Sequence, residues 1–240
     1  MIDALMPTLS CAEMFSDAPE STMFSSEAVA VLNAAAERRG EFCTVRFCAR
    51  EAMQQIGVPA ATLLPDGDGV PRWPLGVVGS MTHCPGYRAA VVAQSAVLGS
   101  VGIDAEPNAA LPDSVSELVM CDEERADVLR LSNVFTDVHW DRVLFSAKEA
   151  VYKAWFPLTR RWLDFNDVSM TLRPDGTFHA DVREGGPRVV DTCPDTFAGR
   201  WMVGRGLVVT ATTVSHHQAA AEPAERTGVG LAVHEQKLAS

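Results

Sequence analysis

Two acidic residues stand two positions apart at the end of an apolar segment, Val101-Gly-Ile-Asp-Ala-Glu106. On a β-strand, residues i and i+2 share a face, so Asp104 and Glu106 are expected to point together. Two carboxylates on one face repel each other unless a cation lies between them. Mg²⁺ suits such a site, because it takes hard oxygen ligands and keeps positions for water and phosphate. The alternative is that the strand has simply reached solvent, which is the commoner outcome for an isolated Asp-x-Glu.

A third acid lies beside a lysine in the segment Phe145-Ser-Ala-Lys-Glu-Ala-Val-Tyr-Lys153. On a helix, Glu149 and Lys153 are i, i+4 neighbours, and an ordinary exposed pair of this kind contributes about 0.3–0.5 kcal/mol. Aromatic residues lie near the same helix face, so the pair borders the apolar side of the helix: Phe145, Tyr152 and Phe156. A carboxylate and an ammonium in that position indicate a site for proton transfer and anion stabilisation.

Lysine is scarce in this chain, which has 20 basic residues of which only Lys148, Lys153 and Lys237 are lysine. Two of the three lie five residues apart in one segment. Arginine does not replace lysine where a compact, titratable ammonium is needed. This clustering of lysine favours a functional role for the segment, and chance clustering is the alternative.

Two further groups of residues could bind phosphate. Thr82 and His83 end the segment Gly79-Ser-Met-Thr-His83, and a histidine there can donate a hydrogen bond to a phosphate, although a lone histidine is more often structural. Several arginines share the segment 38–50, and the planar fork of a guanidinium matches phosphate oxygens. Because Glu37, Glu41 and Glu51 are interleaved with them, a solvated helix surface is the alternative. These arginines are Arg38, Arg39, Arg46 and Arg50.

Hydrophobic periodicity, glycine and proline predict the elements that carry these residues. We expect helices over 25–57, with a bend around Gly40, over 114–131 and over 139–156, and a loop over 59–74. Strands are expected over 77–82, 89–95, 100–106, 168–172, 177–182, 200–203 and 207–213. Residues 1–24 show no clear pattern and are predicted to be irregular. This order predicts an α+β fold with mainly antiparallel pairing.

Composition narrows the class of protein. A chain of 240 residues that is 47% hydrophobic and 21% charged is typical of a soluble globular protein. The net charge of −11 argues against general nucleic-acid binding. We find no apolar run of about 18 residues and no signal-peptide pattern at the N-terminus, so no membrane contact and a cytoplasmic location are expected. The six cysteines contain no Cys-x-x-Cys spacing, which gives zinc ribbons and thioredoxin-type chemistry no support.

The order and spacing of three motifs, GSMTH, VGIDAEP and FSAKEAVYKAW, resemble those of the Sfp/EntD-type 4′-phosphopantetheinyl transferases. The likeness is closest to the actinobacterial members of this family, since three longer segments are also similar to that group. The resemblance covers roughly residues 37–213. The longer segments are ERRGEFCTVRFCAR, HWDRVLFSAKEAVYKAWFPLTRRWLDF and RGLVVTA.

The resemblance implies a fold of two similar α+β halves related by a pseudo-twofold axis, with coenzyme A in the cleft between them. Residues 1–100 would form the N-terminal half, with the coenzyme phosphate and adenine contacts. Residues 101–214 would form the C-terminal half, with the metal and the catalytic helix, and 215–240 a flexible tail. It also implies a Mg²⁺ ion, with Mn²⁺ as an alternative, held by Asp104, Glu106, Glu149 and the backbone carbonyl of Ala105.

The resemblance further implies how the coenzyme is held. Thr82 and His83 would contact it, His83 near the 3′-phosphate, and Arg38 and Arg46 would hold the same phosphate. Lys153 would contact the pyrophosphate, and the loop 65–68 would cover the adenine. One departure stands out: close relatives often carry a lysine in this loop, where this chain has Pro65 and, nearby, Asp66 and Asp68. Arg72 is then the nearest basic residue that could replace the lysine.

The implied reaction transfers the 4′-phosphopantetheine arm of coenzyme A to a serine of an apo acyl or peptidyl carrier protein and releases 3′,5′-ADP. Glu149 is the expected general base, and Lys153 would stabilise the charge of the leaving group. Arg160, Arg161 and Trp162 are candidate contacts for the acidic carrier. A monomer is the family default.

The system that this activity would serve is not determined by the sequence. Fatty-acid, polyketide, nonribosomal peptide and siderophore synthases all stay open as sources of the carrier. Two other classes of protein are alternatives. One is a non-catalytic carrier-binding subunit, and the other is a different metal-dependent phosphoryl or nucleotidyl transferase, for which no Gly-x-x-x-x-Gly-Lys-Ser/Thr or Gly-x-Gly-x-x-Gly motif is present.

Overall fold

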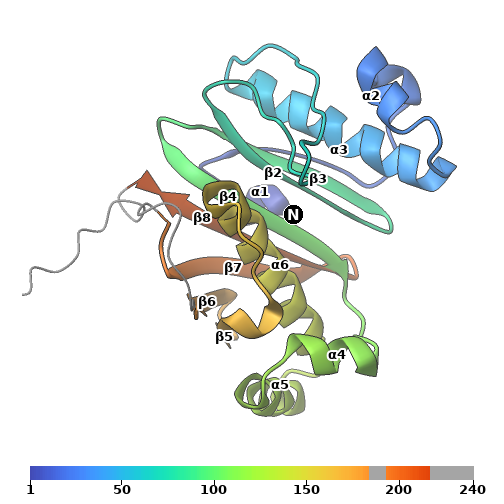
Figure 1. Cartoon of the computed structure of the whole chain (residues 1–240). Coiled ribbons are helices and arrows are strands. Elements are labelled where there is room, and N and C mark those ends of the chain that lie inside the picture. Colours follow the sequence, from blue (N-terminus) through green and yellow to red (C-terminus); the bar gives the residue numbers. More distant parts are fainter. Residues whose placement is uncertain (184–192, 217–240) are drawn as a thin grey trace, which may run out of the picture.

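The structure, a computed structural model, describes residues 1–183 and 193–216 and contains two antiparallel sheets (Figure 1). The first has the order β1-β3-β2 and the second the order β4-β8-β7-β6-β5. The first sheet consists of β1 (Ser10–Met14), β2 (Val77–Cys84) and β3 (Tyr87–Gln94). The second consists of β4 (Leu98–Pro107), β5 (Val168–Leu172), β6 (Thr177–Val182), β7 (Thr196–Gly204) and β8 (Leu207–Ser215). The α+β class predicted from the sequence is therefore confirmed.

Helix α3 (Ala36–Gln55) covers one face of the first sheet and buries its small and apolar side against it. This side contributes Cys48, Ala49, Ala52 and Met53, which pack on Val77, Ala90 and Val92. The predicted bend around Gly40 is wrong. The chain instead breaks between α2 (Ser25–Ala30) and α3, and Gly40 lies inside α3. A Cβ at Gly40 would lie 2.6 Å from Oδ2 of Asp17. Glycine at this position therefore makes room for the side chain of Asp17 and does not bend the helix.

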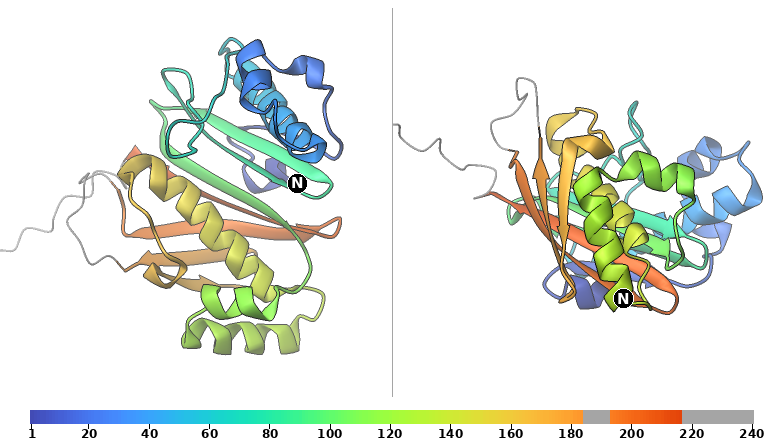
Figure 2. Two further views of the ribbon diagram at one scale, coloured as in Figure 1. Left: turned by 45° about the vertical axis from the view of Figure 1, so that its right-hand side comes forward. Right: turned by 90° about the horizontal axis from the view of Figure 1, so that it is seen from below.

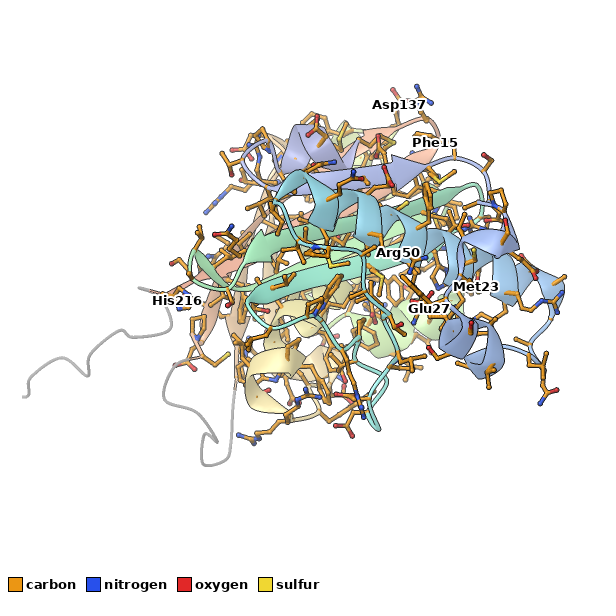
Figure 3. All side chains as sticks on the ribbon, turned by 90° about the horizontal axis from the view of Figure 1, so that it is seen from above. Phe15, Met23, Glu27, Arg50, Asp137 and His216 are labelled. Atoms are coloured by element: carbon orange, nitrogen blue, oxygen red, sulfur yellow. The ribbon has the colours of Figure 1, made fainter. Side chains whose placement is uncertain are left out.

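A buried ion pair joins α2 to α3. Nη1 of Arg50 lies 3.0 Å from both carboxylate oxygens of Glu27, and the two side chains point toward each other in Figure 3. Glu27 also accepts hydrogen bonds from the backbone N–H groups of Phe24 and Leu63. Arg50 is therefore structural. For this arginine the structure supports neither the predicted phosphate clamp nor the alternative of a solvated surface.

The first 24 residues are ordered, contrary to the prediction. They form α1 (Ile2–Leu5), the edge strand β1 and a 3₁₀ turn, η1 (Glu20–Thr22). Strand β1 pairs with β3 in the register Ser10↔Val92 to Met14↔Arg88. All five β1 residues are half-buried, so the strand lacks the alternation of buried and exposed residues on which a prediction from sequence depends.

Helix α6 (Trp140–Thr159) lies across one face of the second sheet, with α4 (Asp113–Val119) and α5 (Asp122–Val134) at its N-terminal end (Figure 2). The predicted helix 114–131 is thus two helices. They separate at Cys121, whose backbone N–H donates to Glu124 and so begins a new helix. The core between α6 and the sheet contains Trp140, Trp155, Phe178 and Phe197. A second 3₁₀ turn, η2 (Phe165–Asp167), precedes β5.

The two sheets meet where β2 runs beside β4. Side-chain hydroxyls of β2 accept the backbone N–H groups of β4: Ile103 N donates to Ser80 Oγ at 3.1 Å and Ala105 N to Thr82 Oγ1 at 3.0 Å. An apolar core that includes residues of both halves lies behind this contact, among them Ile2, Tyr87, Ile103 and Leu207. Each half therefore pairs one long helix with one antiparallel sheet. The pseudo-twofold relation and the boundary at residue 100 stay predictions.

Gly102 brings α6 against β4. A Cβ at this position would lie 1.9 Å from the backbone oxygen of Ala150 and 2.8 Å from the backbone N of Ala154. Glycine is therefore required for the close approach of helix to strand, which places the residues of α6 next to Asp104. In the part of the chain that the structure describes, no helix combines the length and apolar character needed to cross a membrane. The predicted tail lies outside the described residues except for Ser215 and His216.

Candidate active site

Asp104 is at the centre of the site. It is 5% exposed and accepts three hydrogen bonds from two other elements. Lys153 Nζ on α6 donates to Oδ1 at 2.7 Å, and Thr82 Oγ1 on β2 lies 3.3 Å from the same oxygen. Ser146 Oγ, also on α6, donates to Oδ2 at 2.8 Å. The strand, the helix and the neighbouring sheet therefore converge on one carboxylate.

Glu106 lies beside Asp104 and is paired with a residue that the sequence analysis did not single out. Nη1 of Arg142 donates to Oε2 of Glu106 at 3.0 Å, and the remaining guanidinium nitrogens donate to the carbonyls of Ala109 and Ala110. Burial raises the pKa of the Glu106 carboxyl, and the negative charge of Asp104 raises it further. Arg142 partly offsets this effect and keeps the side chain beside the site.

Glu149 faces the same carboxylate from α6. Burial raises the pKa of Glu149 above its ordinary value, and the charge of Asp104 adds to this effect, while Lys153 opposes it. A carboxyl with a raised pKa is a better proton acceptor near neutral pH than an ordinary glutamate. The charge of Asp104 therefore acts on both other acids, Glu106 on the same strand and Glu149 on α6, the three residues that the family resemblance implied lie together.

A second cluster lies across the cleft and consists of Arg38, Glu41 and His83. Nη1 of Arg38 lies 2.8 Å from Nε2 of His83, and Glu41 Oε1 lies 3.3 Å from Nδ1. Because a guanidinium only donates, Nε2 is the acceptor and the proton of the neutral imidazole is on Nδ1, facing Glu41. Burial lowers the pKa of His83, which Arg38, Lys153 and Arg88 lower further and Glu41 raises.

Two predicted phosphate contacts have side chains that are already engaged in the protein. Thr82 is 2% exposed, and its hydroxyl links Ala105 N to Asp104. Arg46 is buried over the ring of Phe42, and its nitrogens donate to the carbonyls of Leu63 and Phe42. Burial lowers the pKa of Arg46 to about 10, so it stays cationic at neutral pH. Arg46 therefore contributes mainly its positive charge to the cleft, because its N–H groups already donate hydrogen bonds within the protein.

A cleft of about 270 Å³ lies between the two halves and joins these clusters. Cationic and imidazole side chains line it together with apolar ones, which suits a ligand that carries both phosphate and rings. Helix α3 contributes Arg38 and Arg46, β2 contributes Ser80 and His83, α6 contributes Tyr152, Lys153 and Phe156, and the loop before β2 contributes Asp68 and Val70.

An apolar groove of about 400 Å³ lies on the other side of Tyr152 and begins at Glu149. Nothing in the sequence indicated it. Trp162, a candidate carrier contact in the sequence, is 77% exposed and forms one wall, with its ring centroid 5.4 Å from that of Tyr152. The other walls come from Leu118, Leu163, Phe165 and Val168. No local pattern marks this groove, because its walls come from α4, α6, η2, β5 and the segment after α6.

The loop at 65–68 is connected to the end of α6. Nη1 of Arg160 lies 2.5 Å from Oδ2 of Asp66 and 3.6 Å from Oδ2 of Asp68. Arg160 is therefore paired within the protein, whereas the sequence suggested that it contacts a carrier protein.

The comparisons with known proteins agree with these features. A family described as the 4′-phosphopantetheinyl transferase N-terminal domain matches residues 26–93, and the 4′-phosphopantetheinyl transferase superfamily matches residues 100–210. The 4′-phosphopantetheinyl transferase Svp of Streptomyces mobaraensis is 49% identical over 227 residues, 92% of each chain. PptT of Mycobacterium tuberculosis is 48% identical over 208 residues, 85% of this chain and 91% of that protein. Npt of Nocardia iowensis is 37% identical over 226 residues, 88% of this chain and 98% of that protein.

These matches define the class of protein as an enzyme of group transfer that uses coenzyme A as its co-substrate. The chain belongs to the 4′-phosphopantetheinyl transferases, and the resemblance inferred from its motifs is confirmed. Its activity is the transfer of 4′-phosphopantetheine from coenzyme A to a carrier protein.

Proposed function

We propose that the transfer depends on Mg²⁺, with Mn²⁺ as a possible substitute, and that its acceptor is a serine of an apo acyl or peptidyl carrier protein. The second product is then 3′,5′-ADP. The observation that carries this proposal is the convergence of Asp104 from β4 with Lys153 and Glu149 from α6 at one side of a cationic cleft.

The donor chemistry supports a hard divalent cation. Asp104, Glu106 and Glu149 are carboxylates, and the charge of Asp104 raises the pKa of both others, a repulsion that a cation would relieve. Among residues 1–183 and 193–216, no group of three or more His, Cys, Asp or Glu side chains is close enough to form a metal site by itself. Mg²⁺ commonly uses one or two carboxylates and completes its coordination with water and substrate phosphate. The carbonyl of Ala105 is retained as a further candidate ligand.

The bound metal would neutralise the pyrophosphate of coenzyme A and polarise its phosphoryl oxygens. Glu149 takes the proton of the carrier serine, whose oxygen forms a bond to the phosphorus that carries the pantetheine. The bond from this phosphorus to the ADP portion breaks, and the leaving group takes the electron pair. Lys153 stabilises the negative charge that develops on the leaving group. Its ammonium lines the cleft and lies 2.7 Å from Oδ1 of Asp104, a proposed metal ligand.

The cluster of Arg38 and His83 holds the 3′-phosphate in this proposal. Arg38 is about half exposed and directs Nη1 into the cleft region that His83 also lines. Arg46 also lines the cleft and adds positive charge. The hydroxyl of Thr82 is buried, so the coenzyme would contact the backbone near Thr82 and not this hydroxyl. Once a phosphate replaces the contact with Arg38, His83 can carry a second proton and donate from Nε2, with Glu41 stabilising the imidazolium.

The apolar groove beyond Glu149 is the part of the site that fits the pantetheine arm. It starts at the proposed base and is lined mainly by apolar side chains, whereas the cleft on the other side of Tyr152 carries the cations. A coenzyme molecule that spans both would bring its diphosphate to Lys153. This arrangement assigns Trp162 and Tyr152 to the coenzyme and leaves Arg161 as the candidate carrier contact.

One assay tests the proposal. The protein is incubated with coenzyme A, Mg²⁺ and an apo acyl or peptidyl carrier protein, and the carrier is weighed by mass spectrometry. We expect a mass gain equal to one phosphopantetheine arm, loss of the gain in excess chelator, and recovery when Mg²⁺ is restored. Transfer that is unaffected by chelator contradicts the metal. Binding of the carrier without mass gain supports the alternative of a non-catalytic carrier-binding subunit.

The same assay can identify the class of carrier that this enzyme prefers. Carriers of fatty-acid, polyketide, nonribosomal peptide and siderophore synthases are compared at equal concentration, and the highest kcat/KM identifies the preferred class. A cytoplasmic location and a monomer complete the proposal.

A further inference from the structure

The loop that precedes β2 is folded around Asp66. Oδ1 of Asp66 accepts the backbone N–H groups of Asp68 at 3.0 Å and of Val70 at 2.9 Å, and its own N–H donates to the carbonyl of Val70 at 2.8 Å. Pro65 and Pro71 form an isolated β-bridge that closes the loop. The loop presents Asp68 to the cleft that also contains Arg38 and Lys153.

Arg160 reaches this loop from the other half of the molecule. It lies directly after α6, 94 residues from Asp66, and its guanidinium contacts the second oxygen of Asp66 and approaches Asp68. The hydrogen bond from Arg160 holds the pKa of Asp66 below its usual range, so this acid stays charged. The ion pairs therefore connect the loop that contributes Asp68 to the cleft with the end of α6, in the pocket beside the cleft.

The backbone of Arg160 adds an independent observation. Its φ of 55° and ψ of 25° are left-handed, a conformation that glycine adopts readily and a side chain does not. Glycine is the usual residue at such a helix end. The arginine therefore occupies this position at a backbone cost, and its guanidinium contacts the loop.

The charges around the cleft explain why the contact matters for the coenzyme. The cleft is lined by Arg38, Arg46 and Lys153 but also by Asp68, and Asp66 lies beside it in the adjoining pocket that contains Arg160. Unpaired carboxylates there would repel the phosphates of the coenzyme over the roughly 8–10 Å at which charges interact at physiological salt. Arg160 brings the positive charge that offsets them.

We propose that Arg160 is a positioning residue for coenzyme A, because it fixes the 65–71 loop against α6 and offsets the charge of Asp66 and Asp68. The inference rests on the proposed function, in which coenzyme A binds in this cleft.

The first test is Arg160→Gly, which keeps the left-handed backbone and removes the ion pairs. We expect the KM for coenzyme A to rise about threefold to tenfold with kcat changed less than twofold, as befits a partly exposed charge pair. Thermal stability is not expected to fall, since glycine relieves the backbone. The matched control is Arg205→Gly, because Arg205 is the other non-glycine residue of the described chain with positive φ, at 54°, and its guanidinium lies over Phe15. This control should leave the KM for coenzyme A unchanged.

Two further measurements separate a charge effect from a merely structural one. Asp68→Asn combined with Arg160→Gly should return the KM for coenzyme A part of the way to that of the wild type, because it removes the one of the two offset charges that lines the cleft. Raising the salt concentration should also reduce the difference between Arg160→Gly and the wild type, since salt screens exposed charges. A structural role for Arg160 predicts neither result.

An unchanged KM for coenzyme A in Arg160→Gly, or no recovery in the double variant, overturns the inference. So does a rise in the KM for the carrier alone, which would support the carrier contact suggested by the sequence. Arg38→Ala, measured in parallel, separates this failure from that of the proposed site. If Arg38→Ala also leaves the KM for coenzyme A unchanged, the cleft is not the coenzyme site. If Arg38→Ala raises it and Arg160→Gly does not, only the role of Arg160 fails.

Discussion

Helix α6 has two lysines, and the regions around them differ. Lys148 faces α4, α5 and η2, is 1% exposed at its side chain, and donates three hydrogen bonds of 2.8 Å to Val119 O, Phe165 O and Glu124. Lys153 faces β4 and is 30% exposed at its side chain. Its single hydrogen-bond partner within the described residues is Asp104.

The difference shows that lysine can either stabilise the fold or line a candidate functional site. An ammonium has three donors, and Lys148 uses all of them within the protein, so its charge connects α4, α5 and η2 to α6. Lys153 keeps donors for a ligand and lies at the edge of a cleft. Buried charges are stable where they are paired, and an incompletely paired charge beside a cavity indicates function.

The largest effect is expected from removing the partner of Lys153. Asp104→Ala should lower kcat by about 10²–10⁴, because a proposed metal ligand and the anchor of the lysine are lost together. Mass spectrometry of the carrier under single-turnover conditions measures this rate. Asp181→Ala removes an exposed acid from β6 and is the matched control with no expected change. Near-normal turnover of Asp104→Ala with Mg²⁺ would contradict the assignment.

Replacing each lysine by methionine tests the comparison directly. Lys148→Met leaves Glu124 buried without its cation and should lower the free energy of unfolding by about 3–5 kcal/mol, as measured by urea denaturation. Lys153→Met should lower kcat by about 10²–10³ and leave the free energy of unfolding within about 1 kcal/mol. The double variant Lys148→Met/Glu124→Gln should recover part of the lost stability. Equal losses of stability in both single variants would refute the distinction.

Gly102→Ala tests whether the two regions depend on the close approach of α6 to β4. The new Cβ meets the backbone of Ala150 and Ala154, so the helix must move, and a displacement of about 1 Å can lower a rate about 100-fold. Overpacking of this kind also destabilises by about 1–3 kcal/mol. Thermal unfolding and kcat are both measured. Gly204→Ala, where the nearest atom is 3.6 Å away, should change neither. A silent Gly102→Ala would show that the helix can shift without affecting the site.

The smallest effect concerns the opposite wall of the cleft. Burial, Arg38, Lys153 and Arg88 lower the pKa of His83, and Glu41 raises it, so the free protein holds this imidazole neutral at pH 7. A bound phosphate favours the protonated form and raises this pKa. Affinity for coenzyme A should therefore rise as pH falls from 8 to 6.5, by at most about tenfold per pH unit. Calorimetry in buffers of different ionisation enthalpy should detect proton uptake. His83→Gln should remove both the uptake and this part of the pH dependence, and persistence of either would exclude His83 as the titrating group.

The sequence predicted the strands around the motifs and the helix over 139–156, because their periodicity and turn residues are local signals. It also predicted that Asp104 and Lys153 belong to one site, through motif order. The role of Lys148 could not be predicted, since its partners come from positions 119, 124 and 165 and two of them are backbone carbonyls. The contact of Glu41 with His83 could not be predicted either, because the two residues are far apart in the sequence; Glu41 indicated only the alternative of a solvated helix surface.

The seam between β2 and β4 has a consequence for association with other chains. A strand that ends a sheet normally offers its main-chain donors to any passing strand, which invites self-association. Here the hydroxyls of Ser80 and Thr82 accept the N–H groups of Ile103 and Ala105, so the strand that carries Asp104 is protected from such pairing. The same two hydroxyls that join the sheets at the cleft thus also occupy main-chain donors that another strand would otherwise use.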